Sequence, residues 1–220
     1  MSRVEKSALP SESGRENAQS QTEDLSEEFH ALLRQVGSPD LAPHGESFLR
    51  LAERETPFCL GSFLEEYLER FLLPHELPAI VAARRHAERG EFRELLAQDQ
   101  GLVSPLRGTP LAEPSRRIGR LQMARLRPLR DNRLVQRYLS AVESGRAHGW
   151  HTVVYGITLA VFSLPLRQGL LHYCHETLAV LASAATRSKK PDEIDADQSL
   201  PGLLARLPEA VEAILVAECH

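Results

Sequence analysis

The sequence has few aromatic residues, few β-branched residues and almost no lysine. Aromatic residues make up 5% of the 220 residues, and 35 leucines stand against 17 valines and isoleucines. Because β-branched residues suit a pleated sheet best, this composition argues against a large sheet. It predicts an all-α fold.

The chain also lacks a long hydrophobic run. Its most apolar segment, 151–166, is interrupted by glycine, serine and proline, whereas a membrane-spanning helix needs about 18 apolar residues in succession. Residues 1–21 are polar and have no apolar centre of the kind that a secretory signal requires. These absences predict a cytoplasmic protein without a membrane partner.

Cysteines and catalytic motifs are scarce as well. Cys59, Cys174 and Cys219 form no Cys-x-x-Cys pair, which argues against a disulfide framework and a zinc knuckle. The sequence has no glycine-rich phosphate loop and no Gly-x-Ser-x-Gly motif. Its acidic runs, such as 192–197, are typical of solvated loops. The sequence therefore predicts a protein that is not an enzyme.

Helical periodicity fills most of the chain. Residues 1–24 are predicted to be a disordered tail, because they have almost nothing apolar to bury. Residues 25–217 are predicted to form a single-domain bundle of about ten helices, and 218–220 are the C-terminal end. The segment from Leu166 to about Ala185 is rich in small residues and is predicted to be the central helix.

Prolines and glycines set the predicted helix boundaries. A turn is expected at 43–45, and Pro74 is expected to end the helix that precedes it. Gly90 is expected to mark the C-terminus of another helix. Pro208 is expected to kink or split the last one.

Arginine dominates the cationic residues. Of 26 lysines and arginines 23 are arginine, and eight of these lie within 116–137. Arginine is enriched at protein interfaces and also binds phosphates, but Tyr138 is the one aromatic residue nearby for base stacking. We predict a protein interface or pairing with acids of the chain, with nucleic-acid binding and ordinary solvated surface as alternatives. The candidate interface residues are Arg116, Arg117, Arg120 and Arg127.

Two pairs of residues could ligate a metal ion. His172 and His175 are three residues apart on one side of a predicted helix, and Cys219 and His220 end the chain. Each pair supplies two ligands and needs more from elsewhere. A structural or interface role for the histidines and a mobile end for the second pair are favoured, and a helical metal-binding enzyme stays an alternative.

Four segments resemble motifs of the urease accessory protein UreF family. Residues 148–156 (HGWHTVVYG) are similar to its Gly-His-x-x-Val-Val-Phe-Gly signature, and 115–120 resemble its Ser-x-x-Met-Gly-Arg helix. Residues 77–92 resemble a helix pair broken at an acidic residue and glycine. Residues 163–166 and the long helix up to Arg187 resemble the family's Leu-Gly-Ile-Pro turn, central helix and terminal Val-Arg.

The resemblance covers about residues 28–216, in order, and departs from the family in two places. The family's N-terminal Ser-x-Phe-Pro motif is poorly matched at 37–48. After Arg187 the sequence Ser-Lys-Lys-Pro-Asp replaces the usual Leu-Ile-Pro-Leu-Gly-Gln. The chain therefore resembles a divergent member.

The resemblance implies an all-α, homodimeric, non-catalytic scaffold that binds UreD (also called UreH), the GTPase UreG and the urease apoprotein. It implies GTP-dependent nickel insertion into urease, with nickel as cargo, GTP bound by UreG and no cofactor held stably by this chain. It assigns contact with UreG to Arg187, with Lys189 and Gln198 in the segment that follows. The signature residues expected to have a structural role are His148, His151, Tyr155 and Gly156.

Overall fold

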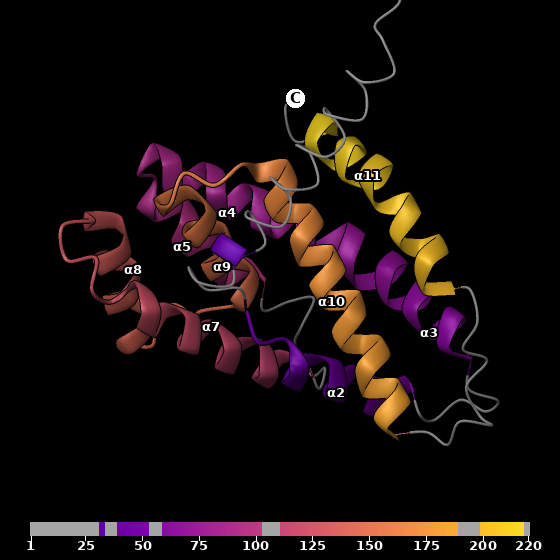
Figure 1. Ribbon diagram of the computed structural model, residues 1–220. Helices are drawn as coiled ribbons and strands as arrows, with labels where there is room; N and C mark the ends of the chain where they lie inside the picture. The colour runs from indigo at the N-terminus through magenta and orange to yellow at the C-terminus, as the bar shows by residue number, and fades with distance from the viewer. Residues whose placement is uncertain (1–30, 34–38, 53–58, 103–110, 189–198, 218–220) are drawn as a thin grey trace, which may run out of the picture. The chain divides into compact units, whose positions relative to one another are not determined.

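The computed structural model describes residues 31–33, 39–52, 59–102, 111–188 and 199–217 (Figure 1). Residues 31–33 are helical and belong to a separate unit, Met1–Val36, whereas the rest lie in one compact unit, Gly37–His220. In the described ranges of that unit every regular element is a helix, which confirms the predicted all-α fold. The helices are α2 (Ala42–Ala52), α3 (Leu60–Tyr67), the π-helix η1 (Leu68–Glu76), α4 (Leu77–Arg89), α5 (Phe92–Gly101), α7 (Ala112–Leu126), α8 (Arg133–Glu143), α9 (His151–Val161), α10 (Leu166–Ser188) and α11 (Ser199–Ala217).

Helix α9 lies deepest in the compact unit. All its residues from His151 to Leu159 are buried, as expected for a helix that is apolar on every face. It packs against α4 and α7, whereas α10 packs mainly against α2 and α11 and leaves His175 and Ala179 exposed. Helix α10, which the sequence predicts as the central helix, contacts α2, α3, α4 and α11. Its small residues fit against these neighbours on some of its faces and meet solvent on others.

The predicted turn at 43–45 is wrong, because α2 begins at Ala42 and includes these residues. Pro43 stands in the first turn of the helix, where its missing N–H costs no hydrogen bond. Asp40 accepts a hydrogen bond from the Ala42 N–H at 3.2 Å. As a result His44 is carried into the core and is 2% exposed.

The predicted helix end at Pro74 is also wrong. The chain continues from α3 through η1 into α4 without a break, and Pro74 lies inside η1. A π-helix bonds each N–H to a carbonyl five residues back, so its wider turn relieves the clash that proline causes in an α-helix. Gly90 does end α4, with a left-handed φ of 69°, and Pro208 lies inside α11, which is one continuous helix.

The structure also bears on membrane insertion. No helix within the described ranges is both long enough and apolar enough to cross a bilayer.

Candidate functional site

Motif segments that are separate in the sequence meet around the N-terminus of α9. The Ser115 hydroxyl of α7 lies 2.7 Å from Nδ1 of His151. One turn further along α7, a Cβ added to Gly119 would lie 1.9 Å from the carbonyl oxygen of Gly149. Gly149 itself has φ of 71°, a conformation that favours glycine. The serine and both glycines are therefore explained by contact between α7 and the backbone that leads into α9.

Asp99 of α5 holds the backbone that leads into α9. Its carboxylate is completely buried and accepts hydrogen bonds from the backbone N–H groups of His148, Gly149 and Trp150 at 2.5, 3.0 and 3.4 Å. It also accepts one from the Tyr138 hydroxyl at 2.6 Å, and its carbonyl oxygen accepts from the Trp150 indole at 2.8 Å. Burial and then the charge of Asp99 raise the pKa of Tyr138 well above its usual value, so the hydroxyl remains a donor.

A second group of buried polar side chains links six helices. At its centre, Oε1 of Glu76 accepts from the Tyr67 hydroxyl at 2.7 Å and lies 3.3 Å from Nε2 of His44. Oε2 accepts from the Tyr173 hydroxyl at 3.0 Å, and that hydroxyl lies 2.7 Å from Nε2 of His151. We call this group the Glu76 cluster. Its members are His44 (α2), Tyr67 (α3), Glu76 (η1), Ser115 (α7), His151 (α9) and Tyr173 (α10).

Burial and charge together set the protonation of the Glu76 cluster. Burial alone raises the pKa of Glu76, but the hydrogen bond and charge of His44, with smaller contributions from His151 and Tyr67, outweigh it and lower the pKa to about 2. Burial and then His44 lower the pKa of His151 to about 3, although Glu76 opposes this. Burial and then Glu76 raise the pKa of Tyr67 and Tyr173. An ionised carboxylate is thus held by neutral hydroxyl donors.

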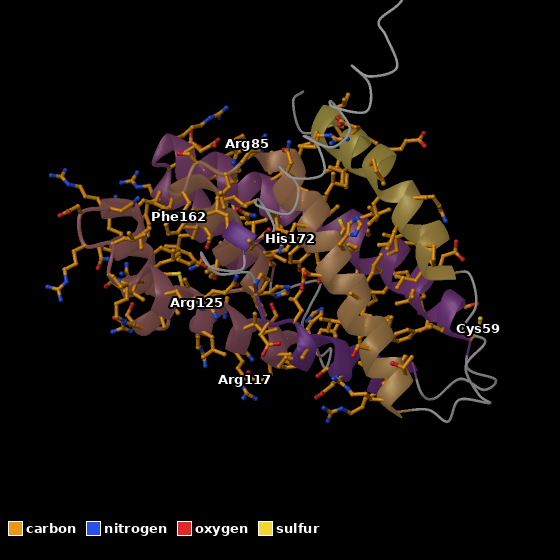
Figure 2. The ribbon with its side chains drawn as sticks, in the orientation of Figure 1. Cys59, Arg85, Arg117, Arg125, Phe162 and His172 are labelled. Atoms are coloured by element: carbon orange, nitrogen blue, oxygen red, sulfur yellow. The ribbon has the colours of Figure 1, made fainter. Side chains whose placement is uncertain are left out.

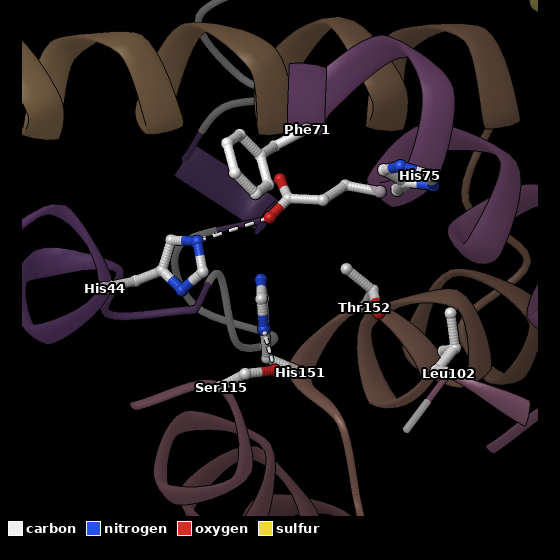
Figure 3. Close-up of a pocket in the computed structure, with 8 residues that line it drawn as sticks. His44, Phe71, His75, Leu102, Ser115, His151 and Thr152 are labelled. Carbon is white, nitrogen blue, oxygen red and sulfur yellow. Dashed lines mark hydrogen bonds and ion pairs between the residues drawn. The ribbon is translucent and has the colours of Figure 1, made fainter. Parts of the chain in front are cut away.

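A cavity of about 70 Å³ lies beside the Glu76 cluster (Figure 3). Its wall contains His44, Phe71, His75, Glu76, Leu102, Ser115, His151 and Thr152. Nδ1 of His44 is buried and has no hydrogen-bond partner among the described residues. Among all the residues that the structure describes, no group of three or more histidine, cysteine or acidic side chains is arranged to hold a metal ion. The observed contacts of the cluster join helices to one another.

The other signature residues of α9 contact neighbouring helices. The Tyr155 hydroxyl donates to the carbonyl oxygen of Gly169 in α10 at 3.0 Å. A Cβ added to Gly156 would lie 2.6 Å from the Ile80 carbonyl oxygen of α4. His148 precedes α9, and the centre of its ring lies 5.4 Å from the centre of the Trp150 ring in the same segment.

The four candidate interface arginines fall into two pairs. Arg116 lies 2.9 Å from Glu113 and 5.7 Å from the centre of the Trp150 ring, and Arg127 lies 2.8 Å from Glu143. Arg117 and Arg120 are exposed, and neither has an ion-pair partner in the part of the chain that the structure describes. Figure 2 shows Arg117 projecting outward from α7. Ion pairs with glutamates of the chain therefore account for Arg116 and Arg127, but not for Arg117 and Arg120.

Arg187, the candidate contact for UreG, is exposed in the last turn of α10. Its guanidinium lies 3.8 Å from the carboxylate of Glu46 in α2. Lys189 and Gln198 lie outside the described residues.

The two candidate metal-ligating histidines of α10 differ in exposure. His172 is buried, at 1% exposed, whereas His175 is exposed one turn later. Cys219 and His220 lie outside the described residues.

These contacts define an all-α protein in which buried polar side chains tie helices together, while arginines of α7 face solvent. The family model of UreF matches residues 45–203, so the chain belongs to the UreF family. This match confirms the resemblance seen in the four motif segments. No curated protein and no solved structure matches the chain in the corresponding comparisons.

Proposed function

We propose that this chain is a urease accessory protein and acts as a non-catalytic scaffold. It binds UreD (UreH) and the GTPase UreG as a cytoplasmic homodimer, and positions them on the urease apoprotein for GTP-dependent nickel insertion. Nickel is the cargo of the complex, UreG binds the GTP, and this chain holds no cofactor stably. The observation that carries the proposal is the UreF match over residues 45–203.

The described interior supports a scaffold role. Asp99 and the Glu76 cluster use their polar atoms to join helices, and these contacts position α9 against α5, α7 and α10. The charged side chains of α7 and α10 that face solvent therefore lie on helices that are packed against a well-ordered core. Charged and apolar side chains fixed on such a body favour binding of a protein partner, because little ordering is needed on association.

Complex formation tests the proposed function directly. The purified chain is mixed with UreD and UreG from the same source and separated by gel filtration. We expect co-elution with UreD, and recruitment of UreG to that complex. Separate elution of the chain and UreD would refute the scaffold role.

Arg187 provides a sharper test of how UreG is recruited. Arg187→Ala is expected to weaken recruitment of UreG about tenfold while leaving the helical circular dichroism unchanged, as for an interface residue that is exposed in the free protein. Arg206→Ala is the matched control, since the two side chains are 60% and 58% exposed and each is close to a glutamate. Equal recruitment by both variants would remove Arg187 from the docking site.

A further inference from the structure

The outer face of α7 carries a leucine among arginines. Leu121 is 60% exposed, although large apolar side chains are usually buried. Arg117 and Arg125 lie one turn before and one turn after it, and Arg120 and Ala124 border the same face. All five side chains are exposed. An apolar centre with a charged rim is the arrangement found in protein interfaces.

Two arginines of this face meet no opposite charge from the described helices. Arg117 and Arg120 have no ion-pair partner there, whereas Arg116 and Arg127 on either side are each paired with a glutamate. Arg130, which follows α7, is exposed as well. A partner that brings carboxylates would supply the missing opposite charge.

We propose that Arg117, Arg120, Leu121, Ala124 and Arg125 form a docking face for an acidic amphipathic helix of a partner protein. Leu121 packs into the apolar stripe of that helix, and the guanidinium groups bind the carboxylates beside the stripe, a geometry in which arginine forms two parallel hydrogen bonds. The inference rests on the proposed function, because the partner is UreD or UreG.

Nucleic acid fits this face less well than an acidic helix. Single-stranded binding surfaces stack bases on exposed aromatic rings, but α7 contains no aromatic residue and Tyr138, the one aromatic residue of α8, is completely buried. Phosphate contacts would also leave Leu121 unused. An acidic helix uses both the leucine and the arginines.

The test compares substitutions at the face with matched substitutions elsewhere. Leu121→Asp is paired with Val216→Asp, since Val216 of α11 is 62% exposed. Arg120→Glu is paired with Arg93→Glu, since Arg93 is exposed on α5. Affinity for purified UreD and UreG is measured by calorimetry at low and physiological salt. We expect both α7 variants to lose about tenfold or more in affinity for one partner, and both controls to match the wild type.

Each outcome decides the inference. If the wild-type chain binds a partner and Leu121→Asp binds equally well, the docking face is wrong and the proposed function stands. If only Arg120→Glu weakens binding, no leucine anchor exists and the inference is overturned. Salt-sensitive binding of a single-stranded RNA oligonucleotide, lost in Arg120→Glu, would then identify nucleic acid as the occupant. If the wild-type chain binds neither UreD nor UreG, the inference and the proposed function fail together.

Discussion

Asp99 is the residue on which the entry into α9 most depends. A buried carboxylate is costly unless its hydrogen bonds are satisfied, and here three backbone N–H groups and one tyrosine hydroxyl satisfy them. The same N–H groups would otherwise be unpaired beside the start of a helix. The carboxylate and the backbone therefore compensate each other.

Replacing the Asp99 carboxylate with an amide tests this compensation. Asp99→Asn keeps the shape but turns one acceptor oxygen into an NH₂ group that faces other donors. We expect a loss of roughly 2–3 kcal/mol in the free energy of unfolding, measured by urea denaturation. Asp131→Asn, at an exposed position, should change it by less than about 0.5 kcal/mol. Equal stability of the two variants would show that Asp99 is not needed to hold the segment.

The sequence could not reveal Asp99. Acidic residues near a helix end are ordinarily solvated, and the backbone partners of this one lie 49 to 51 residues further along the chain. In contrast, the signature segment 148–156 was recognisable as a motif. The segment 115–120, which contains Ser115 and Gly119, was recognisable as well. The contact between these two segments and the role of Asp99 could not be predicted.

Close packing of α4 and α9 depends on one glycine. A Cβ added to Gly156 would lie 2.6 Å from the Ile80 carbonyl oxygen and 2.8 Å from Cβ of Ala83, so Gly156→Ala must push the helices apart. We expect it to lower the free energy of unfolding by about 1–3 kcal/mol. Gly202→Ala in α11 is the control, because an added Cβ has no atom within 4 Å. It should be neutral or stabilising by up to about 1 kcal/mol.

The elements themselves differ in how well the sequence predicts them. Helices α4 and α8 follow from periodicity together with local signals, since Gly90 ends the first and the Asn132 side chain caps the second by accepting from the Val135 N–H at 3.1 Å. Pro43 and Pro74 misled the prediction. A proline interrupts a helix only where its N–H is needed or its ring clashes, and that depends on helix register, which local sequence does not determine.

Across the whole molecule, the Glu76 cluster couples stability to pH. The pKa of His151 is about 3 in the folded chain and about 6.5 in the unfolded chain, so the unfolded chain binds more protons between these values. Stability therefore falls as the pH drops from 6.5 towards 3. The pKa of Glu76 is lowered from 4.5 to about 2, so its contribution is present above pH 4.5 and is lost as the pH falls through 2.

The two groups act in the same direction, so acid should destabilise the chain in two overlapping stages. Each group changes the free energy of unfolding by at most about 1.4 kcal/mol per pH unit. Urea unfolding measured between pH 7 and pH 2 should show a free energy of unfolding that begins to fall below pH 6.5 and falls more steeply below pH 4.5. His151→Gln should remove the first stage, and Glu76→Gln should flatten the second. His175→Gln, at an exposed position of α10, should leave both stages in place. A wild-type profile that is flat between pH 6.5 and 4.5 would mean that His151 takes up its proton in the folded chain as readily as in the unfolded chain. Nδ1 of His151 would then donate to the Ser115 hydroxyl, while Nε2 donates to the Tyr173 hydroxyl in either case.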